Sequence, residues 1–159
     1  MEYMNTDQNS LVFTCELKTS SSLANKIAKK IKTPQLIELV GDLGGGKTTF
    51  VKALGKALGI EKTITSPTFN IHRSYEYSNN VLEHFDLYRL ANDEIVLNEL
   101  KECLQNPNAI VVVEWAQNFK DILNDDRLII KFEYIDDNTR KLTFTAEGIK
   151  SKQLLEALK

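Results

Sequence analysis

A glycine-rich segment at residues 41–48, Gly-Asp-Leu-Gly-Gly-Gly-Lys-Thr, constrains the fold of this chain more than any other feature. It matches the pattern G-x-x-x-x-G-K-[ST] at every position. The setting is also the one that the pattern requires, because the apolar run 36–40 before it predicts a buried strand and the apolar residues of 50–58 recur at helical spacing. The sequence therefore predicts a strand, a phosphate-binding loop and a helix in direct succession.

The residue types in this loop each suit a bound phosphate. Glycines reach backbone angles that other residues avoid, so successive N–H groups can surround phosphate oxygens, and the helix N-terminus adds partial positive charge. We expect Lys47 to reach the β- and γ-phosphates and the Thr48 hydroxyl to bind Mg²⁺. A glycine-rich turn that only connects two elements would not require a lysine and a threonine next. The predicted nucleotide-binding residues of the loop are Asp42, Leu43, Gly44, Gly45, Gly46, Lys47, Thr48 and Thr49.

Two acidic residues end apolar strands farther along the chain. Glu114 follows the run Ile110–Val113, and Asp86 ends a predicted strand at 81–86. Ligands of open α/β sheets bind at the carboxyl ends of the strands, where both carboxylates would emerge. We assign Glu114 to the metal and Asp86 to water positioning or metal support.

Nothing in the sequence predicts recognition of guanine. The nearest match to Asn-Lys-x-Asp, at 118–121, has its lysine one place late, and the Asp-x-x-Gly pattern occurs only at 42–45, inside the loop itself. ATP is therefore the expected nucleotide, together with Mg²⁺.

The remaining pattern predicts an α/β fold with a mixed sheet that has a parallel centre and antiparallel flanking hairpins. Glu38 interrupts an otherwise apolar central strand, from which we expect one face of that strand to be partly open. Other strands are expected at 11–17, 69–77, 81–86, 110–113, 127–134 and 141–146, and other helices after the caps offered by Ser20–Ser22, after Asn92 or Asp93, and from Ser151.

The bulk composition fits one soluble domain over residues 1–159. The net charge of −2 supplies no basic surface for nucleic acid, so any role with RNA would need a partner. Cys15 and Cys103 belong to no Cys-x-x-Cys or Cys/His motif, which predicts two reduced thiols rather than a zinc or redox site. Without a signal sequence or a bilayer-spanning run, the chain is expected to be cytoplasmic with no membrane contact.

Four segments together resemble one protein family. They are Gly-Asp-Leu-Gly-Gly-Gly-Lys-Thr-Thr at 41–49, Thr-Ser-Pro-Thr at 65–68, His-Phe-Asp-Leu-Tyr-Arg-Leu at 84–90 and Val-Glu-Trp at 113–115. In this order they resemble the TsaE (YjeE) family of small bacterial P-loop ATPases. The resemblance implies work with TsaB and TsaD in making threonylcarbamoyladenosine on tRNAs that read ANN codons, with tRNA met indirectly through the complex.

The resemblance also implies roles for single residues. Residues 65–68 correspond to a switch-like loop in which Thr68 senses the γ-phosphate, and Asp86 corresponds to the catalytic aspartate. With Lys47 these form the predicted catalytic set. Glu114 corresponds to the Mg²⁺-linked glutamate and Trp115 to an active-site tryptophan.

The pattern leaves the roles of two histidines less defined than those of the loop residues, and one loop glycine differs from the family. His84 could carry a proton, but a histidine on a strand of this alternation is more often a packed or surface residue, and His72 receives no role. Gly45 stands where family members usually carry alanine, and binding should survive that difference because no N–H donor is lost.

Three functional hypotheses follow. The first is an ATPase, weak alone and stimulated by partners, whose hydrolysis drives or resets the tRNA-modifying complex. The alternative is a small-molecule P-loop kinase, although its arginine-bearing lid has no counterpart among the scattered arginines Arg73, Arg89, Arg127 and Arg140. The third is a nucleotide-sensing module with negligible hydrolysis.

Overall fold

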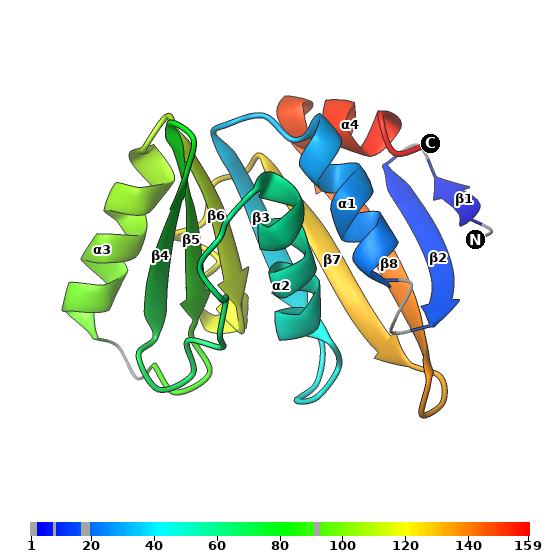
Figure 1. The fold of residues 1–159 in the computed structure, drawn as a ribbon, viewed down its shortest axis with the longest axis horizontal. Helices are drawn as coiled ribbons and strands as arrows, with labels where there is room; N and C mark the ends of the chain where they lie inside the picture. Colours follow the sequence, from blue (N-terminus) through cyan, green and yellow to red (C-terminus); the bar gives the residue numbers. More distant parts are fainter. Residues whose placement is uncertain (1–2, 8, 17–19, 91–92) are drawn as a thin grey trace.

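The computed structural model describes residues 3–7, 9–16, 20–90 and 93–159, and it contains an eight-stranded sheet with the order β1-β2-β8-β7-β3-β6-β5-β4 (Figure 1). Its strands are β1 (Tyr3–Asp7), β2 (Ser10–Glu16), β3 (Gln35–Val40), β4 (His72–Tyr77), β5 (Asn80–Asp86), β6 (Ala109–Glu114), β7 (Arg127–Tyr134) and β8 (Thr139–Glu147). The helices are α1 (Ser20–Lys30), α2 (Lys47–Leu58), α3 (Glu94–Gln105) and α4 (Ile149–Glu156), with a 3₁₀ turn η1 (Ala116–Phe119).

The centre of the sheet is parallel and its flanks are antiparallel. β3 pairs in parallel with β6 on one side and with β7 on the other, and β5 extends this parallel set. The pairs β4–β5, β7–β8, β2–β8 and β1–β2 are antiparallel. The predicted α/β fold with a mixed sheet is thus confirmed.

Apolar side chains cover both faces of the sheet. Ile37, Leu39 and Val112 belong to a buried cluster that also includes apolar residues of α1, α2 and α4. Leu36 and Val113, which point the other way along the same strands, belong to a second cluster with residues of α3 and η1. Figure 1 shows α1 and α2 crossing one face of the central strands, with α3 beside β4 and β5. Within the described residues, no helix is long and apolar enough to cross a membrane.

The structure corrects two predicted boundaries. The strand expected from residue 69 begins at His72, because the amides of Asn70 and Ile71 both donate to the Pro67 carbonyl and form a turn. The last helix begins at Ile149 rather than Ser151, since the carboxylate of Asp126 accepts hydrogen bonds from the amides of residues 150 and 151 at 2.8 and 2.9 Å.

The structure confirms one further predicted boundary, the cap of α3, and adds a strand, β1. The expected caps of α3 were Asn92 or Asp93, and the structure has Asp93 accepting from the amide of Ile95 at 3.0 Å. Asn92, and Leu17 at the end of the first predicted strand, lie outside the described residues. Strand β1 was not predicted at all.

The expectation that Glu38 leaves one face of β3 open is wrong. The Glu38 side chain is buried, and the Arg127 Nε lies 3.2 Å from its Oε2. Arg127 also contacts the half-exposed carboxylate of Glu147 at 2.8 Å. Burial raises the pKa of Glu38, and the guanidinium of Arg127 opposes that rise. A pair of charges from adjacent parallel strands therefore replaces the expected opening.

Arg127→Met should leave the buried Glu38 carboxylate without its cation. We expect the free energy of unfolding at neutral pH to fall by about 3–5 kcal/mol, the usual loss when one partner of a buried ion pair is removed. Without Arg127, the pKa of Glu38 in the folded protein lies still farther above its value in the unfolded chain. The loss of unfolding free energy should therefore grow as the pH rises from the unfolded pKa to the folded pKa of Glu38, and shrink at more acidic pH. Urea unfolding at several pH values measures it.

Two controls separate this ion pair from its exposed neighbour. Glu147→Gln removes only the outer partner of Arg127 and should cost less than about 1 kcal/mol. Glu38→Gln combined with Arg127→Met should recover part of the loss. A loss that is the same at every pH would contradict the assignment.

Candidate functional site

The loop that follows β3 is shaped by a close backbone contact at its first residue. Gly41 has φ 152°, and a Cβ atom there would lie 2.8 Å from the carbonyl oxygen of Phe132 on β7. Such a contact is too short for any side chain, so only glycine lets the chain leave β3 alongside β7. This contact directs residues 42–46 over the end of the parallel strands.

The loop runs directly into α2. Gly46 occupies the helix N-cap with φ 106°, a left-handed conformation that glycine adopts readily. A hydrogen bond from the Gly45 amide to the Asp42 carbonyl at 3.1 Å closes the turn before it. A Cβ at Gly45 would lie 3.0 Å from that same carbonyl oxygen, so glycine relieves a tight contact here. The first amides of α2 are consequently presented at the open end of the loop.

Lys47 is buried at the start of α2. Its ammonium donates to the carbonyls of Gly41 and Asp42 at 2.9 and 3.0 Å, and it lies 4.0 Å from Oε2 of Glu114. Burial lowers the pKa of Lys47, while the carboxylates of Glu114, Asp86 and Asp42 oppose that change. The loop thus holds a positive charge at its centre.

The two predicted acids lie side by side. Asp86 and Glu114 end adjacent parallel strands and face each other in the register of β5 and β6. Both are buried, at 5% and 3% exposure. The pairing therefore places two carboxylates beside one ammonium at the carboxyl end of the sheet, as the strand-end argument predicted.

His84 contacts one member of this acidic pair, Glu114, and the sequence alone leaves its role open. It is completely buried, and its Nε2 lies 2.8 Å from Oε1 of Glu114. Among the described residues its Nδ1 has no hydrogen-bond partner. The ring thus holds one oxygen of Glu114 while Lys47 lies near the other. His84 is a packed histidine that orients a site carboxylate. Its position two residues before Asp86, on the same face of the strand, was the signal available in the sequence.

The segment 65–68 reaches the acidic pair through Thr68. The Thr68 hydroxyl donates to Oδ2 of Asp86 at 2.6 Å and lies 2.6 Å from the Ser66 hydroxyl. The Tyr88 amide donates to the second oxygen of Asp86 at 3.1 Å. The Asp86 carboxylate is therefore held on both oxygens, and one of its partners, Thr68, is partly exposed to solvent.

Trp115 forms one wall beside Lys47. The Lys47 ammonium lies 4.5 Å from the centre of the Trp115 ring. The centres of the Tyr88 and Trp115 rings are 4.9 Å apart. Trp115 has a left-handed backbone, φ 61°, which a bulky residue adopts only where its surroundings require it. The turn directs the indole over the loop.

These residues surround one hollow of about 280 Å³, close to the lower limit of roughly 300 Å³ for small-molecule pockets. The lining residues are Leu43, Gly44, Gly45, Gly46, Lys47, Thr48, Thr49, Ser66, Thr68, Asp86, Glu114 and Trp115. Of the predicted site residues, only Asp42 lies outside this set, and it contributes its carbonyl to Lys47 and Gly45. The structure thus brings together nearly all of the residues that the sequence singled out.

In this mixed α/β sheet a glycine-rich loop joins a central strand to a helix, and a buried lysine lies beside an acidic residue of the adjacent strand. These features define a P-loop NTPase fold, a class that binds nucleoside triphosphates. The family model described as "Threonylcarbamoyl adenosine biosynthesis protein TsaE" matches residues 14–142. The chain belongs to the TsaE family.

Individual relatives agree with this assignment. The tRNA threonylcarbamoyladenosine biosynthesis protein TsaE of Bacillus subtilis (strain 168) is 34% identical over 145 residues, covering 91% of this chain and 90% of that protein. The protein of the same name from Aquifex aeolicus is 38% identical over 122 residues, covering 76% and 84%. The crystal structure of Bacillus subtilis YdiB superposes with a TM-score of 0.79 at 28% identity, covering 99% of this chain and 96% of that one.

Proposed function

We propose that this chain binds ATP with Mg²⁺ in the hollow above β3 and hydrolyses it as the ATPase component of tRNA threonylcarbamoyladenosine biosynthesis. The observation that carries the proposal is the convergence of the glycine loop, Lys47 and two buried strand-end carboxylates in one place. One ammonium beside two carboxylates is a charge pattern suited to a phosphate chain that arrives with a divalent cation.

The loop and Lys47 account for phosphate binding. The amides at the start of α2 and the Lys47 ammonium face the hollow, so phosphate oxygens can replace the backbone carbonyls that Lys47 now contacts. The hollow is small for a whole nucleotide, and this supports a site that encloses the phosphates and leaves the nucleoside near its rim. Adenine is the proposed base because the sequence carries no guanine-recognition pattern.

The donors present fit a magnesium ion. Thr48 offers a hydroxyl and Glu114 a carboxylate, and hard oxygen ligands are those that Mg²⁺ prefers. Bound there, the ion would neutralise charge that develops on the phosphate oxygens. The hydrogen bond from His84 holds the Glu114 carboxylate in position.

Asp86 and Thr68 are the proposed hydrolytic pair. Asp86 can accept a proton from a water molecule or support the metal ion, and both roles need the fixed orientation that Tyr88 and Thr68 provide. Thr68 is partly exposed, and its hydroxyl can exchange its hydrogen bond to Asp86 for one to a γ-phosphate oxygen. The segment 65–68 is thereby proposed to sense the nucleotide.

Membership of the TsaE family supports the tRNA-modifying assembly over a small-molecule kinase. We infer that TsaB and TsaD are the partners, that tRNA is met through them in the cytoplasm, and that the partners raise a low intrinsic turnover. The geometry agrees, because none of the arginines that a kinase lid would need lines the hollow in the described part of the chain.

Glu114→Gln should lower ATP hydrolysis far more than ATP binding. The amide keeps the size of the side chain but removes the charge proposed to hold Mg²⁺, so turnover should fall roughly 10²–10³-fold while affinity changes less than about tenfold. Steady-state phosphate release and calorimetry measure the two effects. Glu76→Gln, an exposed glutamate on β4, is the matched control and should behave as wild type. Equal losses in turnover and affinity would contradict the assignment.

The tRNA function is tested by mass spectrometry of tRNA nucleosides from cells depleted of this protein. Threonylcarbamoyladenosine should disappear, return with the wild-type gene or the Glu76→Gln control, and stay absent with Lys47→Ala, because that variant loses its charged phosphate contact. Unchanged threonylcarbamoyladenosine after depletion would overturn the proposal.

A biochemical control distinguishes the assembly from the alternatives. ATPase turnover should be low for the protein alone and rise when TsaB, TsaD and tRNA are added. Turnover that stays the same when the partners are added would contradict a role in the tRNA-modifying complex. Phosphate transferred to a metabolite instead of water would support a kinase.

A further inference from the structure

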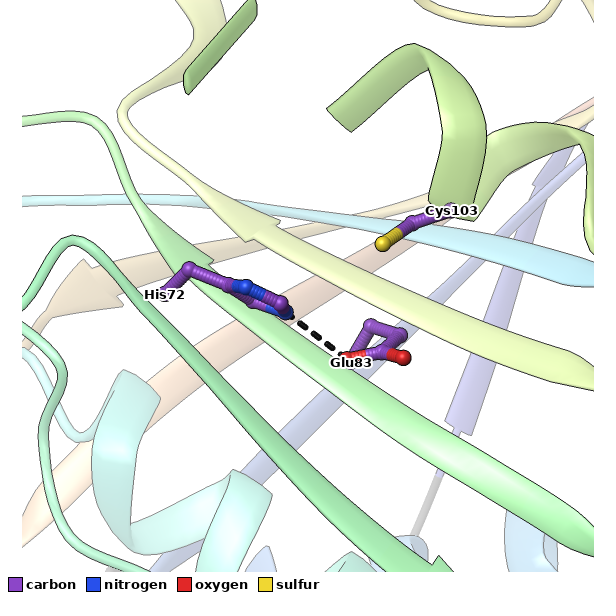
Figure 2. Close-up of side chains that lie close together, drawn as sticks. All are labelled: His72, Glu83 and Cys103. Atoms are coloured by element: carbon purple, nitrogen blue, oxygen red, sulfur yellow. Dashed lines mark hydrogen bonds and ion pairs between the residues drawn. The ribbon is translucent and has the colours of Figure 1, made fainter. Parts of the chain in front are cut away.

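The other face of the β4–β5 hairpin carries a cluster that the nucleotide site does not use. His72 begins β4, Glu83 lies within β5, and Cys103 projects from the last part of α3 towards both (Figure 2). Because side chains alternate along a strand, Glu83 points away from the face that bears His84 and Asp86. The cluster is therefore separated from the nucleotide hollow by the sheet itself.

The donor atoms of these three residues converge. One nitrogen of His72, one carboxylate oxygen of Glu83 and the sulfur of Cys103 all lie within 4.8 Å of one another. Nitrogen, oxygen and sulfur ligands at about 2.0–2.3 Å from a common centre are typical of Zn²⁺ sites. Three protein ligands leave a fourth tetrahedral position for water.

The His72 ring is already oriented as a metal-binding histidine would be. Its Nδ1 lies 2.8 Å from the Glu99 carboxylate, and its plane stacks on Phe85 at 4.0 Å with an interplanar angle of 8°. This leaves Nε2 directed at Glu83, 2.7 Å away. A carboxylate behind the histidine that fixes its tautomer and its orientation is the usual outer partner of a zinc ligand.

Carboxylates make the surroundings of Cys103 negative. Burial and the carboxylates of Glu83, Glu99 and Glu102 raise the pKa of Cys103 to about 12. A thiol in such surroundings is a poor nucleophile. Glu83 is itself 7% exposed, and the His72 side chain is 14% exposed. A divalent ion here would therefore have largely buried ligands.

We propose that His72 Nε2, the Glu83 carboxylate and the Cys103 thiolate bind a transition-metal dication, Zn²⁺ in preference to Mg²⁺, with Glu99 orienting the histidine. Sulfur and imidazole ligands select Zn²⁺ over the harder Mg²⁺ of the nucleotide site. On binding, the Cys103 thiol and a protonated His72 each lose a proton to solvent. The ion links β4, β5 and α3 just beyond Ile71, whose carbonyl accepts from the Asp86 amide.

The test uses Co²⁺ as a spectroscopic probe on the untagged, nucleotide-free full chain. Cobalt bound to a thiolate gives an intense near-ultraviolet band that oxygen and nitrogen ligands do not give. We expect one Co²⁺ per chain with this band, and we expect Zn²⁺ to displace it. Cys103→Ser should abolish the band, whereas Cys15→Ser, the matched control near the opposite edge of the sheet, should retain it.

Further variants guard against a substitution that merely unfolds the protein. Glu99→Gln should keep the band but weaken Co²⁺ binding about 10–100-fold, the effect of removing an outer partner of a metal ligand. Far-ultraviolet circular dichroism of each variant checks that it is folded, whether or not the chain binds ATP. Absence of the band in the folded wild type, or its persistence in Cys103→Ser, would overturn the proposal and leave His72 as an imidazolium between two carboxylates.

Discussion

The site depends on an unbalanced set of buried charges. Lys47 places one ammonium where Glu114 and Asp86 place two carboxylates, and all three side chains are removed from water. Buried charges are costly unless they are paired, so this arrangement is held by the hydrogen bonds around it: two carbonyls for Lys47, His84 for Glu114, and Thr68 with a backbone amide for Asp86. A phosphate chain with a divalent cation would add charges of both signs to this set.

The rest of the fold serves to bring these charges together. Parallel pairing of β5 with β6 aligns Asp86 with Glu114, and β3 delivers the loop beside them. The close approach of Gly41 to Phe132 sets the path of the loop, and α2 begins at Lys47 itself. Glu38 and Arg127 show that the same sheet accepts charges within its centre when they come as a pair. Apolar clusters pack on both faces of the strands that carry these charges.

What could be predicted from the sequence was local in the chain or followed from one rule about strands. The loop is a contiguous pattern, and Asp86 and Glu114 follow from the rule that ligands bind at the carboxyl ends of parallel strands. What was missed depends on pairings between distant residues. Arg127 meets Glu38 only through the β3–β7 register, and His84 meets Glu114 only through β5–β6. The spacing of Cys103 in the sequence cannot show that α3 places its thiol close to His72 and Glu83. The alternation of apolar and polar residues does not reveal the turn before β4, because that turn is formed by hydrogen bonds from two amides to the Pro67 carbonyl.

The proposed function requires that the hollow bind a nucleoside triphosphate through Lys47 and the loop amides. Isothermal calorimetry with ATP, in the presence of Mg²⁺ and with the ion chelated, tests it on the wild type and on Lys47→Ala. We expect saturable binding to the wild type that weakens by roughly 1.5–3 kcal/mol in the variant, about one to two decades in Kd, because a charge-assisted contact is lost. Absence of saturation with the wild type, or equal affinity in Lys47→Ala, would contradict it.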